Sequence, residues 1–106
     1  MTPEGERHVR YRTEFTDGAR LDLRYLRSHE QGIIVAAIEA QLVWEPGKET
    51  RNRKLLRLNP LADWEMRAGN HRVFYDVLAD TQTVAIKAIG WKEHNALFIR
   101  GKEYHL

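Results

Sequence analysis

The sequence predicts an α+β domain in which helical structure packs on one face of a mostly antiparallel β-sheet. Three observations carry this prediction. Residues 64–90 read as three consecutive strands around a Gly69-Asn70 turn, an apolar stripe with helical spacing follows Ser28, and apolar side chains alternate between Val9 and Phe15. The 106 residues show no break in composition, so we expect a single domain over residues 1–106.

The first segment is expected to be frayed, because residues 1–7 are polar and include Pro3 and Gly5. Val9 to Phe15 then has the period of a strand, which we place at the edge of the main sheet. The next segment, residues 17–27, fits two templates. Leu23 and Tyr25 alternate as in a strand, whereas Leu23 and Leu26 also fit one helical face, so periodicity leaves the choice open.

A helix is expected to start at Ser28. Ser28 and Gln31 have the spacing of a capping box, in which each side chain satisfies a backbone amide of the first turn. The apolar stripe continues through Ile34 and Ile38 until Pro46 stops the helix.

Residues 48–57 form a basic connection to the sheet. A run of charge is usually a solvated loop. This run leads to the edge of a charged sheet face, and phosphate backbones are held mainly by lysine and arginine. The run contains a single acidic residue, Glu49, and its cations are Lys48, Arg51, Arg53, Lys54 and Arg57.

The Gly69-Asn70 turn fixes the register of the first two strands, because both residues tolerate the positive φ of the primed hairpin turns. Trp64 then opposes Tyr75, and Arg67 opposes Arg72. Successive side chains point to opposite faces of a sheet. The face expected to join the core contains Trp64, Met66, Val73, Tyr75 and Val77, and His71 lies at its edge. The other face contains Glu65, Arg67, Arg72, Phe74 and Asp76.

Two arginines directly opposite each other repel, and a bound anion would remove that cost. On this reading, replacing Arg72 would leave stability unchanged or slightly higher. Lys87, in the third strand over Thr83 to Gly90, is expected to share the open face. Glu65 and Asp76 can instead neutralise the arginines as an ordinary solvated face, and periodicity favours this plainer reading.

After Gly90, residues 91–95 are expected to form a loop. Residues 97–99 and 103–105 then form a short hairpin around Gly101-Lys102. The net charge of +2 means that any preference for anions must come from clustering. Absence of cysteine excludes disulfides and thiolate chemistry and fits a reducing cytosol. No zinc motif, signal peptide or membrane-spanning run is present, so no metal, cofactor or membrane is expected.

Two runs carry a family resemblance: RKLLRLNPLADWEMRAGNHRVFYDV and VAIKAIGWKEHNALFIRGKEY. They resemble the RelE/ParE superfamily of small toxins from bacterial toxin-antitoxin pairs. The hallmark positions, a turn glycine with an arginine, an aromatic-rich strand and a second glycine, are Gly69, Arg72, Val73, Tyr75, Val77, Ala88, Ile89, Gly90, Trp91 and Lys92. The resemblance implies a helical hairpin on one face of a twisted, mostly antiparallel sheet, and therefore a helix over residues 17–27. It also implies a bacterial cytoplasmic address and a cognate antitoxin as partner.

The resemblance further implies metal-independent cleavage of messenger RNA, in relatives within the ribosomal A site. Arg72 matches the arginine that relatives direct at the phosphate. Arg67 and Lys92 are expected to stabilise charge, Glu65 to act as base and His94 as acid. RelE has lysine at the position of Glu65 and a functional tyrosine near Phe98, so this chain departs from the RelE pattern. The residues expected to bind RNA are Arg53, Lys54, Arg57, Lys87, Phe74 and Trp91, the last two by stacking on bases.

The alternatives are a ParE-like protein that inhibits DNA gyrase, and a non-toxic relative that only binds an antitoxin. Fold alone does not choose among them. We expect an acidic antitoxin segment to cover Phe74, Trp91 and the basic connection.

Overall fold

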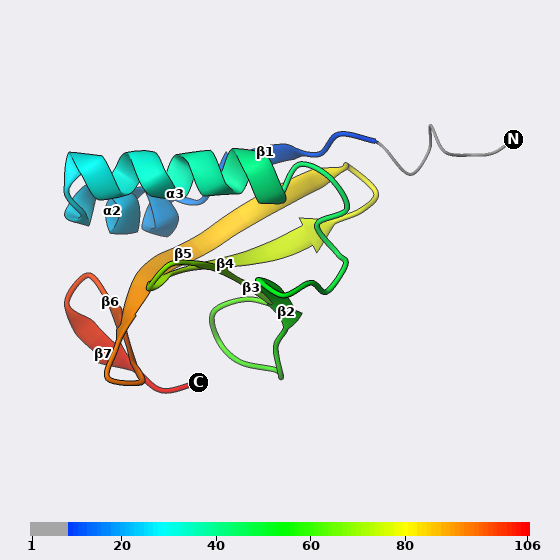
Figure 1. The fold of residues 1–106 in the computed structure, drawn as a ribbon. Coiled ribbons are helices and arrows are strands. Elements are labelled where there is room, and N and C mark those ends of the chain that lie inside the picture. The colour runs from blue at the N-terminus through cyan, green and yellow to red at the C-terminus, as the bar shows by residue number, and fades with distance from the viewer. Residues whose placement is uncertain (1–8) are drawn as a thin grey trace, which may run out of the picture.

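The computed structural model describes residues 9–106, so the expected frayed start lies outside the described residues (Figure 1). The elements are β1 Arg12–Phe15, α2 Asp17–Tyr25, α3 Ser28–Gln41, β2 Arg53–Leu55, β3 Trp64–Ala68, β4 His71–Leu78, β5 Thr83–Glu93, β6 Ala96–Ile99 and β7 Lys102–Tyr104. Within this part of the chain, no helix is long and apolar enough to cross a membrane.

The seven strands form one open sheet in the order β2-β3-β4-β5-β6-β7, and all neighbours in this path are antiparallel. β1 pairs in parallel with β5, so the N-terminal strand does join the edge of the sheet. The predicted register is confirmed, with Trp64 opposite Tyr75 and Arg67 opposite Arg72. Only Gly69 in the turn has positive φ, at 63°, as a type II′ turn requires.

The two helices lie side by side on one face of the sheet, as Figure 1 shows. Thr16 starts α2, because its Oγ1 accepts a hydrogen bond from the Ala19 amide at 3.1 Å. The helical reading of residues 17–27 is therefore correct, with a helix that ends at Tyr25. The core between helices and sheet contains Ala19, Ile34, Ile38, Leu42, Trp64, Met66, Val73, Tyr75, Val84, Ile86 and Ile89.

Helix α3 begins at Ser28, as predicted, but the residue that caps it lies one position earlier than predicted. Arg27 is the N-cap, and its amide donates to Glu30 Oε1 at 3.2 Å. The Gln31 side chain instead donates to the Leu26 carbonyl at 2.8 Å. The capping pair is therefore Arg27 and Glu30, each one residue before the predicted pair of Ser28 and Gln31.

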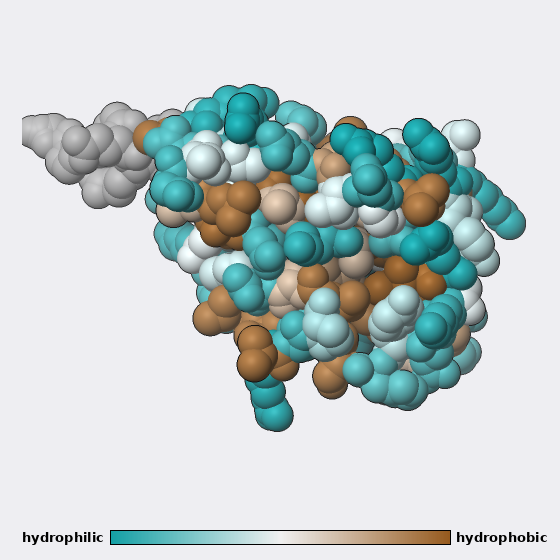
Figure 2. Space-filling model, turned by 180° about the vertical axis from the view of Figure 1, so that it is seen from behind, coloured by the Kyte–Doolittle hydropathy of each residue, from teal (hydrophilic) through white to brown (hydrophobic). Residues whose placement is uncertain are grey.

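A second, smaller core lies on the sheet face opposite the helices. Phe74 and Ala88 from the sheet pack there with Ala62, Leu97 and Ile99. Leu56, Leu61 and Tyr104 cover this cluster from the loop before β3 and from the C-terminal hairpin. In the view of Figure 2, hydrophobic side chains form separate patches between hydrophilic ones and no continuous apolar face.

Several boundaries correct the sequence predictions. The basic connection contains a strand, β2. β5 continues to Glu93, because β6 pairs with its last three residues, so Trp91 is not in a loop. His94 and Asn95 form the next turn with φ of 52° and 68°, and the last hairpin turns at Arg100-Gly101, one residue earlier than predicted.

Candidate functional site

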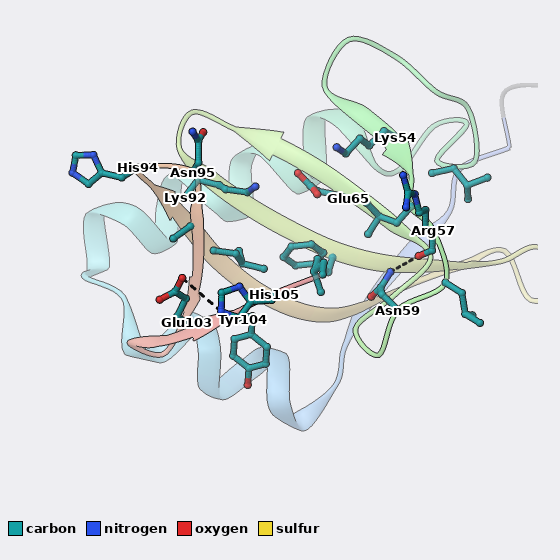
Figure 3. A pocket seen from close by; sticks show the side chains of 17 residues that line it. Lys54, Arg57, Asn59, Glu65, Lys92, His94, Asn95, Glu103, Tyr104 and His105 are labelled. Atoms are coloured by element: carbon teal, nitrogen blue, oxygen red, sulfur yellow. Dashed lines mark hydrogen bonds and ion pairs between the residues drawn. The ribbon is translucent and has the colours of Figure 1, made fainter.

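A hollow of about 1010 Å³ opens on the sheet face that the helices leave free (Figure 3). Its floor includes Glu65, Phe74 and Leu97 from three strands. One wall is the segment over residues 54–59, and the opposite wall is the C-terminal hairpin with the residues that follow it.

The loop wall is held by Asn59. Its side-chain amide nitrogen donates to the carbonyls of Arg57 and Ala62, at 2.7 and 2.9 Å. Its side-chain oxygen accepts from the amides of Leu61 and Ala62. Such a side chain satisfies the backbone of a loop that no strand pairs with, so the wall is built into the fold.

Arg72 and Glu65 are the charged pair on the floor side of the sheet. Arg72 Nε lies 3.1 Å from Glu65 Oε2, and each side chain is only 12% exposed. The Nε hydrogen is not directed at that oxygen, so the contact is an ion pair without a hydrogen bond. Arg72 Nη1 donates to the carbonyls of Gly69 and His71, at 3.0 and 2.9 Å. Burial lowers the pKa of Arg72, and Glu65 opposes that shift.

Arg67 lies opposite Arg72, as predicted, and is exposed. Its positive charge contributes to the lowered pKa of Arg72, which is the repulsion expected of the pair. Glu65, diagonal to Arg72 on the same face, compensates this repulsion without a bound anion. Neither Arg67 nor Arg72 lines the hollow, so they stand beside it.

Three cations do line the hollow. Lys54 pairs across the strands with Glu65, Arg57 stands on the loop wall, and Lys92 pairs with Leu97. In Figure 3, Lys54, Lys92 and Glu65 approach the hollow from different sides. The arrangement can hold a phosphate group beside a carboxylate, since lysine and arginine are the usual ligands of phosphate oxygens.

Four predicted RNA-binding residues occupy other positions. Arg53 is buried, and its Nη1 donates to the carbonyls of Gln41 and Glu45, at 2.8 and 3.1 Å. It therefore closes the C-terminal end of α3, where carbonyls have no helical partner. Phe74 is 0% exposed, so it forms the floor and presents no free face for a base.

Trp91 and Lys87 also lie away from the hollow. Trp91 is on the helix side of β5 and stacks between Tyr25 and Phe98, at ring-centroid distances of 6.0 and 5.9 Å. Lys87 is exposed at an irregularity of the β4–β5 ladder, where Phe74 faces Ala88 but Tyr75 already faces Ile86. The single extra residue shifts the alternation on which its predicted face depended.

Some histidines line the hollow and others lie elsewhere. His71 lies at the core edge, as predicted, with Nε2 3.6 Å from Glu30 Oε2. His94 stands on the turn at the rim, and its ring points away from the hollow in Figure 3. His105, for which no role is predicted from sequence, lines the hollow with its Nε2 3.8 Å from Glu103 Oε2. Its signal was the pairing of the last hairpin, which brings Tyr104 opposite Leu97 of the floor, so that His105 follows at the wall of the hollow. Among residues 9–106, no group of three acidic, histidine or cysteine side chains is arranged to hold a metal ion.

The chain has two helices on one face of an open, mostly antiparallel seven-stranded sheet and a charged hollow on the other face. This is the architecture of a RelE-like α+β protein. A chain of the RelBE2 toxin-antitoxin complex from Mycobacterium tuberculosis is 28% identical and superposes with a TM-score of 0.69, over 79% of this chain and 93% of that chain. A chain of the archaeal RelE-RelB complex from Pyrococcus horikoshii is 20% identical, with a TM-score of 0.59, over 74% and 91%. A chain of the intact RelBE complex from E. coli is 21% identical, with a TM-score of 0.57, over 79% and 99%.

No family model and no curated protein sequence matches the chain. The structural matches confirm the resemblance to the RelE/ParE superfamily that the sequence indicates, and the fold is that of RelE toxins.

Proposed function

We propose that this chain is the toxin of a type II toxin-antitoxin pair and that it cleaves messenger RNA, on the ribosome, without a metal ion. The likeness to chains of three RelE-RelB complexes supports a type II toxin. The observation that carries the proposed chemistry is the hollow itself, because Lys54, Arg57 and Lys92 line it together with Glu65 and His105.

The chemistry requires a base, cations and an acid, and the hollow offers each. Glu65 removes the proton of a ribose 2′-hydroxyl, whose oxygen then attacks the adjacent phosphorus. Lys54 and Lys92 stabilise the additional negative charge on the phosphate oxygens. The bond from phosphorus to the 5′-oxygen breaks, and His105 protonates the leaving oxygen as the general acid. The products are a 2′,3′-cyclic phosphate and a 5′-hydroxyl.

This assignment changes several of the roles predicted from sequence, and Lys54, predicted to bind RNA, now stabilises charge on the phosphate. His105 replaces His94 as the acid, because His94 is directed away from the hollow. Arg72 acts on Glu65, which it contacts, and Arg67 adds positive charge beside the hollow without lining it.

An antitoxin is the proposed protein partner, which the likeness to toxin-antitoxin complexes supports. Its expected surface needs revision, because Phe74 is buried and Trp91 stacks on the helix side. The rim of the hollow instead combines cations with three exposed leucines, Leu55, Leu58 and Leu106. An acidic amphipathic segment of the antitoxin would bury these leucines and pair with the cations, so its binding should weaken as salt rises.

The test combines cleavage with a physiological readout. Purified protein incubated with RNA and EDTA should give fragments ending in 2′,3′-cyclic phosphate, and the Glu65→Gln variant should give far fewer. Induced expression should stop translation before DNA supercoiling changes. If supercoiling failed first and purified protein left RNA intact, alone and with ribosomes, the gyrase alternative would replace the ribonuclease. If growth continued while an antitoxin still bound, the chain would be a non-toxic relative.

A further inference from the structure

The edge of β5 is shared between two strands and has an unpaired stretch between them. β1 pairs with residues 83–86 of β5, and β6 pairs with residues 91–93. Between these two segments no described strand pairs with this edge. Thr16 reaches the start of this stretch, because its hydroxyl donates to the carbonyl of Ile86 at 3.1 Å and to that of Lys87 at 3.4 Å. An unpaired buried amide costs free energy comparable to a lost hydrogen bond, so the rest of the edge also needs a partner.

Asp22 of α2 supplies that partner. Its side chain is 4% exposed, and Oδ2 accepts a hydrogen bond from the Ile89 amide at 3.0 Å. Oδ1 lies 2.9 Å from Arg100 Nε and has no hydrogen-bond partner by geometry, so Arg100 is the cation that compensates it. A buried carboxylate is costly unless it is paired. Asp22 is therefore joined at one oxygen to β5 and at the other to the turn between β6 and β7.

Two further contacts hold the same turn against α2. Gly101 approaches the Tyr25 hydroxyl so closely that a Cβ added there would lie 2.7 Å from the oxygen. The Tyr25 ring continues the stack on Trp91 and Phe98, which belong to β5 and β6. Arg100 and Gly101 have φ of 49° and 78°, so the turn has the sharp geometry needed to reach the helix. Helix α2 thus fixes the C-terminal hairpin from the side opposite the hollow.

The other side of that hairpin is a wall of the hollow. Leu97 of β6 and Glu103 and Tyr104 of β7 line it, and His105 follows directly. We propose that Asp22 is a positioning residue that, through Arg100, sets the β6–β7 hairpin and with it the place of His105 on the wall of the hollow. This inference rests on the proposed function for its effect on cleavage, and on contacts independent of that function for its effect on the hairpin.

A purely structural Asp22 would only satisfy the Ile89 amide. Asp22→Asn separates the two roles, because asparagine keeps an oxygen acceptor of the same shape for Ile89 and loses the charge that attracts Arg100. Arg100→Gln removes the same pair from the other side, and Arg100→Lys retains the positive charge. Arg20→Gln is the matched control, because it breaks the exposed ion pair of Arg20 with Asp17 on the same helix, at 2.9 Å.

The experiment measures amide hydrogen exchange over residues 96–104, together with kcat and KM for cleavage of a short RNA. Asp22→Asn and Arg100→Gln should each raise exchange in the hairpin about tenfold, because local opening becomes easier. Each should lower kcat about tenfold or more, since a displacement of about 1 Å in a catalytic group can cost ~10²-fold. The double variant should be no worse than either single one, Arg100→Lys should restore much of the loss, and Arg20→Gln should match the parent.

Each result has a defined consequence. Unchanged hairpin exchange in a folded Asp22→Asn variant would overturn the proposal. Raised exchange with unchanged kcat would also overturn it, since the hairpin would then be held by Asp22 without setting the site. A parent that does not cleave RNA would refute the proposed function and the effect on cleavage with it, while the exchange result alone would still decide whether Asp22 holds the hairpin.

Discussion

Arg72 and Glu65 form an ion pair across β3 and β4, with Nε 3.1 Å from Oε2 and both side chains 12% exposed. The pair is diagonal, because the direct cross-strand partner of Arg72 is Arg67. Glu65 therefore compensates the repulsion between the two arginines, in agreement with the plainer interpretation of the sequence, and no bound anion is needed. This contact changes what loss of Arg72 should do.

Replacing Arg72 by glutamine should lower stability, contrary to the expectation from the arginine pair alone. The variant leaves a mostly buried Glu65 without its cation, and such a loss typically costs about 1–3 kcal/mol. It should also slow RNA cleavage about 10²-fold, because Glu65 loses the group that orients it. Chemical denaturation and single-turnover cleavage measure both effects. The control is Arg67→Gln, whose exposed side chain should change stability little. An Arg72→Gln variant as stable as the parent would show that the ion pair contributes nothing.

Phe74 gives the second prediction, since the structure makes it part of a small core. Phe74→Ala should lower the free energy of unfolding by about 3–5 kcal/mol, as expected for a buried phenylalanine, while Phe74→Leu should cost less. Affinity for an uncleavable RNA should be nearly unchanged in Phe74→Leu. A stable Phe74→Leu variant that bound RNA much more weakly would instead support the stacking role predicted from sequence.

The main sheet and its core were predictable because they rest on local signals. The Gly69-Asn70 turn sets the register, and alternation then assigns Met66, Val73 and Tyr75 to the helix side, all of which are 0% exposed. Alternation says which face a side chain is on. It does not say whether that face is covered, and Phe74 is buried by segments distant in sequence.

The basic run gave a wrong prediction for Arg53 for a related reason. Arg53 belongs to a basic run, and nothing in that run indicates that the guanidinium closes the end of α3. The pairing of β6 with the end of β5 depends on a turn at His94-Asn95, where two non-glycine residues adopt positive φ. This pair lacks the glycine that marks most two-residue hairpin turns, although asparagine tolerates positive φ. The turn is therefore harder to predict than Gly69-Asn70, and the position of Trp91 and the proximity of His105 to the floor both depend on it.

The third prediction concerns Gly90, a position of the family resemblance that the structure explains. A Cβ at Gly90 would collide with the Phe98 carbonyl oxygen, because β6 passes close to β5 there. Gly90→Ala should therefore destabilise by about 1–3 kcal/mol through overpacking. Gly32→Ala is the control. Nothing lies within 4 Å of a Cβ at Gly32 in α3, so this variant should be more stable by about 0.5–1 kcal/mol. Equal melting temperatures for Gly90→Ala and the parent would contradict the close approach.

The last prediction is the pH dependence that Asp22 gives to stability. Burial raises the pKa of Asp22 above the ordinary value of 3.8, although the Ile89 amide and Arg100 oppose that shift. The folded protein therefore holds this proton at a pH where the unfolded chain has lost it. Stability gained from Asp22 is present below 3.8 and is lost as pH rises through the raised pKa.

At neutral pH the ionised Asp22 is thus a net cost in global unfolding, which Asp22→Asn should remove. The same variant loses the contact with Arg100 that opposes local opening of the hairpin. The variant should unfold at a temperature equal to or above that of the parent at pH 7, and its advantage should shrink as pH falls toward 4. Melting curves of both proteins across this range measure the difference. Asp17→Asn on the same helix is the control, because the Asp17 side chain is 99% exposed. An advantage of Asp22→Asn that grew on acidification would mean that Arg100 and Ile89 outweigh burial, and that the ionised form stabilises the fold.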